Sequence, residues 1–331
     1  MSEQSGPGTV AGGADAGARP TGGTPVAART PLQLALARLR RDRVALAAAV
    51  LLVVLVALAL AAPLVAKLVG HGPNQQLPSE ALTLDGFPVT PNGSFLLGAD
   101  QLGRNVLVRT LYGARVSLLV GIVATAIALV VGTTVGLIAG FVGGRVDTVL
   151  SRIIDIFLSF PFLVTALTLV ALNRDPQGQP RANPVLLVML VIALFTWTFF
   201  ARLVRGQVLS LREREFVEAA RSLGASNRRI MVVDLLPNLV APIIVYATLQ
   251  IPLNIVFEAT LSYLGVGVRP PTPSWGNMLF DAQSSGFYQT QPAFLLGPGI
   301  ALLLTVLAFN LLGDGLRDAL DPRSSRTLAK D

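Results

Sequence analysis

The segment EFVEAARSLGASNRRIMVVDLLP, residues 215–237, is a charged insert between two long apolar runs. The flanking runs, near 184–204 and 239–262, are each long enough to cross a bilayer as a helix, which takes roughly 20 apolar residues. This polar segment connects the two runs, and it must lie outside the hydrocarbon core of the bilayer. It therefore predicts a loop on one side of a membrane protein, where another molecule can bind to it.

The composition agrees with this class. Of 331 residues, 52% are hydrophobic and only 14% are charged, with a mean hydropathy of +0.63, as in polytopic membrane proteins rather than soluble ones. We predict an all-α protein with six transmembrane helices. The predicted spans are 44–68, 115–141, 150–172, 184–204, 239–262 and 294–314.

The basic residues predict the orientation. With six spans, one side of the membrane carries 19 of the 26 Lys and Arg residues, and the other carries 7. Cytoplasmic loops are enriched in Lys and Arg. We therefore expect both termini and the loop 205–237 in the cytoplasm. The net charge of +7 is a topology signal, because the basic residues are scattered over short loops without the aromatic platforms of a nucleic-acid site.

The ends of the chain have their own composition. Residues 1–30 are rich in Gly, Ala, Pro and Thr, which predicts a disordered cytoplasmic leader. Residues 31–43 mix leucine with arginine, which favours a short helix on the membrane surface. A cleavable signal peptide is the competing interpretation, but the polar leader is too long for one. The domain 44–314 then holds the spans, and 315–331 forms a cytoplasmic tail.

Several chemistries are excluded. The chain has no cysteine and one histidine, His71, so a thiol site or a histidine-rich metal site has no ligands. We interpret His71 as a solvated loop residue. The two lysines, Lys67 and Lys330, each follow an alanine, whereas a P-loop needs Gly-Lys-Ser/Thr. Any ATP that drives this protein must bind to another chain.

The loop itself reads as two short helices. Ser210 to Glu213 fit a capping box, which predicts a helix start there. Apolar or small residues then recur at helical spacing and predict one stripe. These are Phe216, Ala219, Ala220 and Leu223. Gly224 can end the first helix in the left-handed conformation, and Ser226 can cap a second. The alternative interpretation is an ordinary solvated loop.

Other residues carry more than one interpretation. The glycines Gly132, Gly136 and Gly140 predict a face of close helix packing, within one subunit or in a transporter core. Pro161 predicts a kink. Arg152 and Asp155, three residues apart, predict an intrahelical ion pair.

Glu258 is an ionisable residue near the end of a predicted span, and such residues tend to be functional. It either lines the outer end of a pathway or pairs with Arg115 or Arg269 at the rim; we favour the pair. Trp275 is expected to anchor a loop at the membrane interface.

Four blocks of sequence resemble the second permease of dipeptide and oligopeptide ABC importers, the DppC/OppC type. They are LGADQLGRNVLVRTLYGARVSLLVG (97–121), TFFARLVRGQVLSLREREFVEAARSLGAS (198–226), EATLSYLGVGVRPPTPSWGNML (258–279) and LAFNLLGDGLRDALDPR (307–323). The resemblance runs from about residue 31 to 325. Ala99, Asn105 and Asp234 depart from the commoner residues of the family, and Asp234 puts details of the docking surface in question.

The resemblance implies a type I ABC importer permease fold in a bacterial plasma membrane. It implies four kinds of partner: a related second permease, two cytoplasmic ATPase subunits that bind ATP and Mg, an extracytoplasmic peptide-binding protein, and lipid. The permease itself is then not an enzyme and holds no cofactor. In this family the "EAA loop" docks on the ATPase. By resemblance its residues here are Glu218, Ala219, Ala220, Gly224 and Pro237.

Other substrates stay open, because nickel, glutathione and oligosaccharide importers use similar permeases. A different class, the ion-coupled secondary transporter, is disfavoured because the two halves of the chain show no inverted repeat. An intramembrane enzyme lacks the usual nucleophile–base or metal parts.

Overall fold

The computed structural model of the chain describes residues 37–320 except 174, 176 and 178–180. Its elements are α2 (Arg43–Val69), α3 (Pro78–Ala81), α4 (Val106–Val142), α5 (Gly144–Ser159), α6 (Phe162–Leu172), α7 (Pro184–Leu211), α8 (Glu215–Ser222), α9 (Asn227–Arg229), the π-helix η1 (Ile230–Leu235), α10 (Leu236–Tyr263), α11 (Trp275–Ser285), the 3-10 helix η2 (Phe287–Gln289) and α12 (Pro292–Leu320). Extended pairing in the described residues is limited to two isolated bridges. The predicted all-α class is confirmed.

Five helical segments are long and apolar enough to cross a membrane, and α5 with α6 makes a sixth if the bent pair is counted as one span. The two helices of this pair meet at 83°. Phe160 between them is extended, and Pro161 caps α6. A proline has no backbone N–H to continue the α5 ladder. The predicted kink at Pro161 is therefore a sharp break in the predicted span 150–172.

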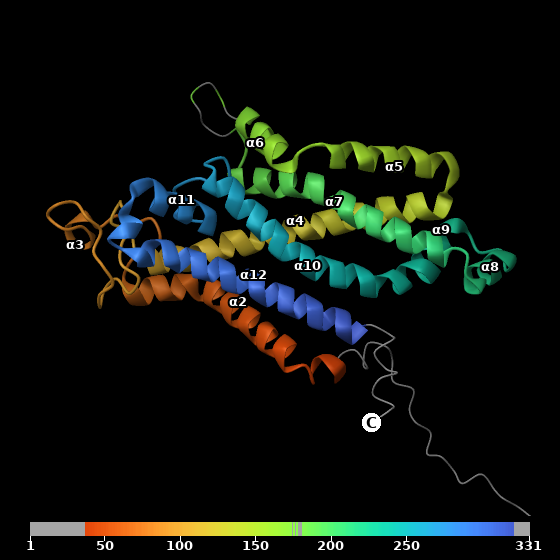
Figure 1. Cartoon of the computed structure of the whole chain (residues 1–331), viewed down its shortest axis with the longest axis horizontal. Helices are drawn as coiled ribbons and strands as arrows, with labels where there is room; N and C mark the ends of the chain where they lie inside the picture. Colours follow the sequence, from red (N-terminus) through yellow and green to blue (C-terminus); the bar gives the residue numbers. More distant parts are fainter. Residues whose placement is uncertain (1–36, 174, 176, 178–180, 321–331) are drawn as a thin grey trace, which may run out of the picture.

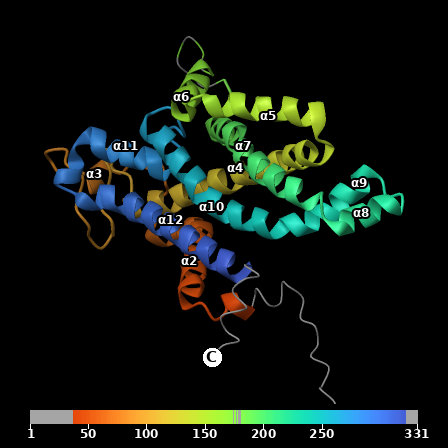
Figure 2. The same ribbon diagram turned by 45° about the vertical axis from the view of Figure 1, so that its right-hand side comes forward.

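The long helices run side by side along one axis (Figure 1). One end of the bundle carries α8 and α9, and we call it the α8 end. The opposite end carries α3, the loops around it and α11, and we call it the α11 end. The first residues of α2 and the last residues of α12 both lie toward the α8 end, and the rotated view shows the same arrangement (Figure 2). Residues 1–30 and 321–331, with residues 31–36 of the predicted surface helix 31–43, lie outside the described residues.

Polar side chains set several helix starts. Asp42 accepts hydrogen bonds from the amides of Val44 and Ala45, at 2.9 and 3.1 Å, and so begins α2. Asn105 caps α4 in the same way, and Asn183 caps α7. Gly70 ends α2 with a φ of +78°, a conformation that favours glycine.

The centre of the bundle is the contact between α4 and α7. A Cβ atom on Gly132 would overlap the carbonyl oxygen of Trp197, and one on Gly136 would lie 2.5 Å from the carbonyl oxygen of Ala201. A Cβ on Gly140 would lie 2.8 Å from that of Val208. Small residues thus let the two backbones approach closely. Of the two interpretations of these glycines, the structure shows packing within one subunit.

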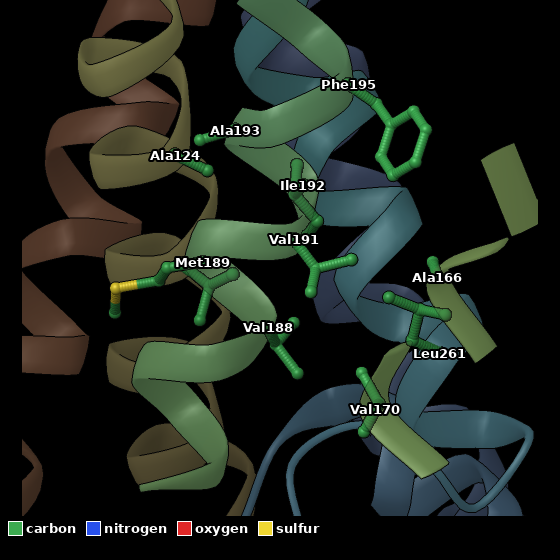
Figure 3. Close-up of a cluster of buried hydrophobic side chains, with 11 residues drawn as sticks. Ala124, Ala166, Val170, Val188, Met189, Val191, Ile192, Ala193, Phe195 and Leu261 are labelled. Atoms are coloured by element: carbon green, nitrogen blue, oxygen red, sulfur yellow. The ribbon is translucent and has the colours of Figure 1, made fainter. Parts of the chain in front are cut away.

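A cluster of buried apolar side chains joins α7 to α4, α6 and α10 (Figure 3). Val188, Ile192 and Phe195 of α7 belong to this cluster, together with Ala166 of α6 and Leu261 of α10. This cluster packs the short helix α6 against α7, although α5 and α6 meet at a sharp bend.

Candidate functional site

The predicted cytoplasmic loop forms a projection beyond the spanning helices, made of α8, α9 and η1 (Figure 1). The predicted capping box at Ser210–Glu213 is wrong, because α7 continues to Leu211 and α8 begins at Glu215 without a side-chain cap. Gly224 follows the end of α8 and has a φ of +78°, the left-handed conformation that was predicted to end this helix. Ser226 caps α9 by accepting from the amide of Arg229 at 3.4 Å.

The two faces of α8 differ. Val217 is fully buried and packs with Ile230 and Leu235 in an apolar cluster that reaches the ends of α4 and α7. Phe216 and Leu223 point outward and are 41% and 88% exposed. The residue that holds α8 to the bundle is thus Val217, and the predicted apolar stripe lies largely on the free surface. Large exposed apolar side chains outside the spans are typical of an interaction site.

The structure brings four of the predicted coupling residues to one tip. Glu218, Ala219 and Gly224 are exposed, and Ala220 is half-buried against the apolar cluster. Pro237 is exposed as well, but it lies after η1 in the first turn of α10.

The π-helix explains how Pro237 is accommodated. The amide of Leu236 bonds to the carbonyl of Met231, five residues back, instead of four. This wider turn precedes a proline, which has no amide to donate. Prolines such as Pro237 and Pro242 would be expected to interrupt the return to the membrane, but the chain enters α10 at Leu236 and the helix runs unbroken through Pro242.

Two arginines, one just before α8 and one within it, contact α4. Arg212 donates to the carbonyl oxygen of Gly140 at 3.0 Å. The guanidinium of Arg221 lies 5.4 Å from the ring centre of Phe141, a cation–π distance. Both contacts reach the last turn of α4. Arg221 thus joins α8 to the end of α4, and Arg212 joins the segment between α7 and α8 to the same turn.

Glu258 is fully buried among α4, α10 and the start of α11. Its carboxylate accepts hydrogen bonds from the hydroxyls of Ser117 and Ser262, both at 2.7 Å. No ion pair in the described part of the chain involves Glu258, and Arg115 is exposed beside the ring of Tyr112. The predicted rim pair is therefore wrong: the carboxylate is stabilised by hydroxyl groups inside the bundle.

The hydrogen bonds of Glu258 extend into the following loop. Ser262 also accepts from the amide of Val268 at 2.9 Å. Ser117 accepts from the amide of Trp275 at 3.4 Å, and the indole of Trp275 donates to the carbonyl of Thr110. Trp275 is fully buried, so the prediction of a membrane-interface anchor is wrong. Glu258 thus holds the loop and the start of α11 against α4.

Buried charges gather at the α11 end. Arg104 pairs with Asp100 at 2.6 Å and with Asp281 at 3.3 Å, and Arg109 lies 3.4 Å from Asp100. Arg109 also donates to the carbonyl of Pro73 at 3.0 Å. Burial raises the pKa of Asp281 above its ordinary value, and Arg104 opposes part of this rise. The charges join the loop before α4 to α11.

His71 belongs to the same end. Its ring stacks on Phe95 with centres 4.8 Å apart, and Nδ1 lies 3.2 Å from the amide nitrogen of Asn105. It is a packed loop residue rather than a freely solvated one. Among the residues that the structure describes, no group of three or more His, Asp or Glu side chains could hold a metal ion.

Comparison with known proteins identifies the family. Residues 132–326 match the model of the binding-protein-dependent transport system inner membrane component, and residues 30–84 match the N-terminal TM domain of oligopeptide transport permease C. The first match spans more than half of the chain and contains α5 to α12. The second contains α2, the first spanning helix.

Characterised relatives are similar over nearly the whole chain. The dipeptide transport system permease protein DppC of Alkalihalophilus pseudofirmus is 40% identical, covering 89% of this chain and 90% of its own. The glutathione transport system permease protein GsiD of Shigella flexneri is 41% identical, covering 89% and 91%. The oligopeptide transport system permease protein OppC of Escherichia coli K12 is 39% identical, covering 90% and 93%.

Solved structures agree on the fold. A chain of the MetNI methionine ABC transporter, in inward-facing conformations, aligns with a TM-score of 0.52 and 20% identity, covering 65% of this chain and 96% of that one. The resemblance drawn from the four sequence blocks is confirmed. The chain is a multi-pass membrane protein and belongs to the family of binding-protein-dependent transport system inner membrane components.

Proposed function

We propose that this chain is one of two permease subunits of an ATP-driven ABC importer for di- and oligopeptides. A related second permease completes the translocation pathway. Two cytoplasmic ATPase subunits bind ATP and Mg, and an extracytoplasmic binding protein delivers the peptide. The observation that supports the proposal is the α8 projection, which exposes Phe216 and Leu223 beyond the spanning helices and carries the residues that, by sequence resemblance, form the docking loop.

In this proposal the coupling residues have distinct roles. Ala219 and Ala220 let the ATPase backbone approach α8 closely. Glu218 offers a carboxylate for charge-assisted hydrogen bonds, and Gly224 sets the turn that ends the helix. Pro237 begins the return to the membrane after the π-helix.

Movement of the projection reaches the pathway through the contacts of Arg212 and Arg221 with α4. Closure of the ATPase pair around ATP shifts α8. Arg212 and Arg221 then carry the movement to the end of α4. ATP can shift the permease between two access states only by as much as it favours one docked arrangement. The rigid α4–α7 pair converts that preference into movement of the bundle.

The distribution of basic residues predicts the orientation of the bundle in the membrane. We place the α8 end, with both chain termini, in the cytoplasm, because the predicted cytoplasmic side carries 19 of the 26 basic residues, and still 16 against 7 when Arg152, Arg202 and Arg205, which line the space between α5 and α7, are left out. The α11 end then faces the binding protein outside the plasma membrane.

The test is purification and uptake of the assembled transporter. The tagged chain is solubilised in mild detergent from cells that also express the proposed partner subunits. The purified complex is then reconstituted into lipid vesicles. The proposal expects stoichiometric co-purification of ATPase subunits and peptide uptake that stops when ATP is removed. Uptake driven by a proton or sodium gradient, without bound ATPase, would instead support an ion-coupled secondary transporter.

Glutathione is a second candidate substrate, favoured by the 41% identity with the glutathione permease of Shigella flexneri. Glutathione is itself a tripeptide, so the two candidates share the chemistry of a free ammonium and free carboxylates. Uptake competition between a dipeptide and glutathione separates them.

A further inference from the structure

Helix α5 presents three faces. Toward the bundle it directs Asp147, Ser151 and Ile154, of which only Ile154 is fully buried. An apolar stripe with steps of three and four residues is exposed and consists of Val146, Val149, Ile153 and Ile156, continued by Phe160 just after the helix. A polar stripe lies about 100° away, by the rotation of 100° per residue in a helix. It consists of Arg145, Thr148, Arg152, Asp155 and Ser159, all exposed.

The polar stripe borders a cavity of about 390 Å³ between α5 and α7. The cavity is lined by Asp147, Thr148, Ser151, Arg152, Ile154, Asp155, Arg202 and Arg205. Two ion pairs cross it. Arg205 donates to both oxygens of Asp147 at 2.5 and 2.8 Å, and Arg202 lies 3.2 Å from Asp155.

These charges are open to their surroundings. The side chains of Arg202 and Asp155 are 61% and 54% exposed, so their ion pair does not shield them. Arg152 is exposed beside them and makes no ion pair within the described residues. The cavity wall therefore displays both signs of charge.

The exposed pair lies level with an uncharged part of the bundle. Gly132 and Gly136 of α4 pack against Ala201, the residue before Arg202. They lie within residues 116–142 of α4, a run without a charged residue. Charged side chains at such depth face the interior of a membrane protein or a water-filled space, because hydrocarbon solvates them poorly.

We propose that this face of α5 and α7 lines a water-filled chamber on the route of the transported solute. The inference rests on the proposed function for the identity of that solute. The chamber suits a short peptide with free ends: Asp155 attracts an ammonium group, and Arg152 and Arg202 attract a carboxylate. The neighbouring apolar stripe of α5 faces lipid or protein, so α5 stands at the wall between water and an apolar surface.

Cysteine labelling tests this directly, because the chain contains no cysteine of its own. Single variants Thr148→Cys and Arg152→Cys report on the polar stripe. Val149→Cys and Ile153→Cys, one residue further along, are matched controls on the apolar stripe at nearly the same height. The assembled transporter, in inside-out membrane vesicles, is treated with a charged, membrane-impermeant methanethiosulfonate, and the labelling rates are measured. Lipid-soluble N-ethylmaleimide shows that every cysteine is present.

We expect the charged reagent to label the polar-stripe cysteines at least ten-fold faster than the controls. Equal or slower labelling, as expected for a surface covered by lipid or a partner protein, would overturn the proposal. The second arm is peptide uptake by intact cells treated with N-ethylmaleimide, which reaches cysteines on both sides of the membrane. Labelled Thr148→Cys is expected to lose uptake, whereas labelled Leu84→Cys, at the α11 end, keeps it. Uptake by both labelled variants would overturn the assignment to the solute route. Absence of uptake in every unlabelled variant would contradict the proposed function instead, since the labelling rates do not depend on transport.

Discussion

Ser117 and Glu258, 141 residues apart in the sequence, are joined by a 2.7 Å hydrogen bond inside the bundle. This bond connects α4 to α10, and the bonds of Ser262 and Trp275 extend it to the loop before α11. A buried carboxylate with hydroxyl donors on two helices therefore organises the α11 end. Its role in this structure is to position other groups.

Replacement of Glu258 tests that role. Glu258→Ala leaves the buried hydroxyls of Ser117 and Ser262 without an acceptor, at a cost of about 1–3 kcal/mol for each unsatisfied group. Glu258→Gln keeps one acceptor oxygen in the same shape and should cost less. We expect thermal unfolding of the detergent-solubilised protein to begin at lower temperature in the order wild type, Gln, Ala. Identical unfolding of all three would rule out a structural carboxylate.

The contact between α4 and α7 predicts opposite effects for one substitution at two glycines. Gly132→Ala places a methyl group against the carbonyl of Trp197, and such overpacking costs about 1–3 kcal/mol. Gly206→Ala, on the exposed face of α7, has open space around it and should stabilise the helix by up to ~1 kcal/mol. Unfolding in detergent measures both. A neutral Gly132→Ala would contradict the close approach.

The buried charges at the α11 end predict a contrast between two arginines. Arg104→Gln removes the paired arginine of Asp281 and the closer of the two arginines beside Asp100, and breaking a buried pair costs about 3–5 kcal/mol. Arg115→Gln removes only an exposed contact with Tyr112, worth roughly 0.5–1 kcal/mol. We expect the first variant to be poorly recovered from membranes and the second to resemble wild type. Equal recovery would show that the cluster adds no stability.

The turn at Gly224 predicts loss of transport without loss of insertion. Space is open around this glycine, so Gly224→Val fails because of its positive φ, which costs a side chain with a branched Cβ at least ~1–2 kcal/mol. We expect Gly224→Val and Glu218→Lys to insert normally and to abolish peptide uptake. Gly224→Asn, which tolerates the left-handed conformation, should retain uptake. Normal uptake by Val and Lys variants alike would contradict the assigned coupling role.

The sequence was sufficient for features that depend on local chemistry. Apolar runs predicted the spanning helices, Pro161 predicted the break, and Gly224 predicted the end of α8, because each follows from the chain's own backbone or its contact with the membrane. The four sequence blocks also predicted the family, because a match between sequences requires no knowledge of contacts in the folded protein.

Features that depend on partners distant in the sequence were missed. Asp155 pairs with Arg202 of α7 rather than with Arg152, so the predicted intrahelical pair is wrong. Trp275 and Glu258 each looked suited to a membrane surface, yet contacts with α4 bury both. Spacing along one helix does not show which helix lies beside it.

The most direct test of the central claim is a crosslink from the tip of α8. Leu223→Cys, at an 88% exposed position in a chain without cysteine, is treated with a short photoactivatable thiol crosslinker in the assembled transporter. Leu84→Cys, fully exposed at the α11 end, is the control. The account predicts that Leu223→Cys forms an adduct with the ATPase subunit and that Leu84→Cys does not. It would be contradicted if the ATPase bonded to neither cysteine, or if impermeant reagents reached Leu223→Cys from outside intact cells.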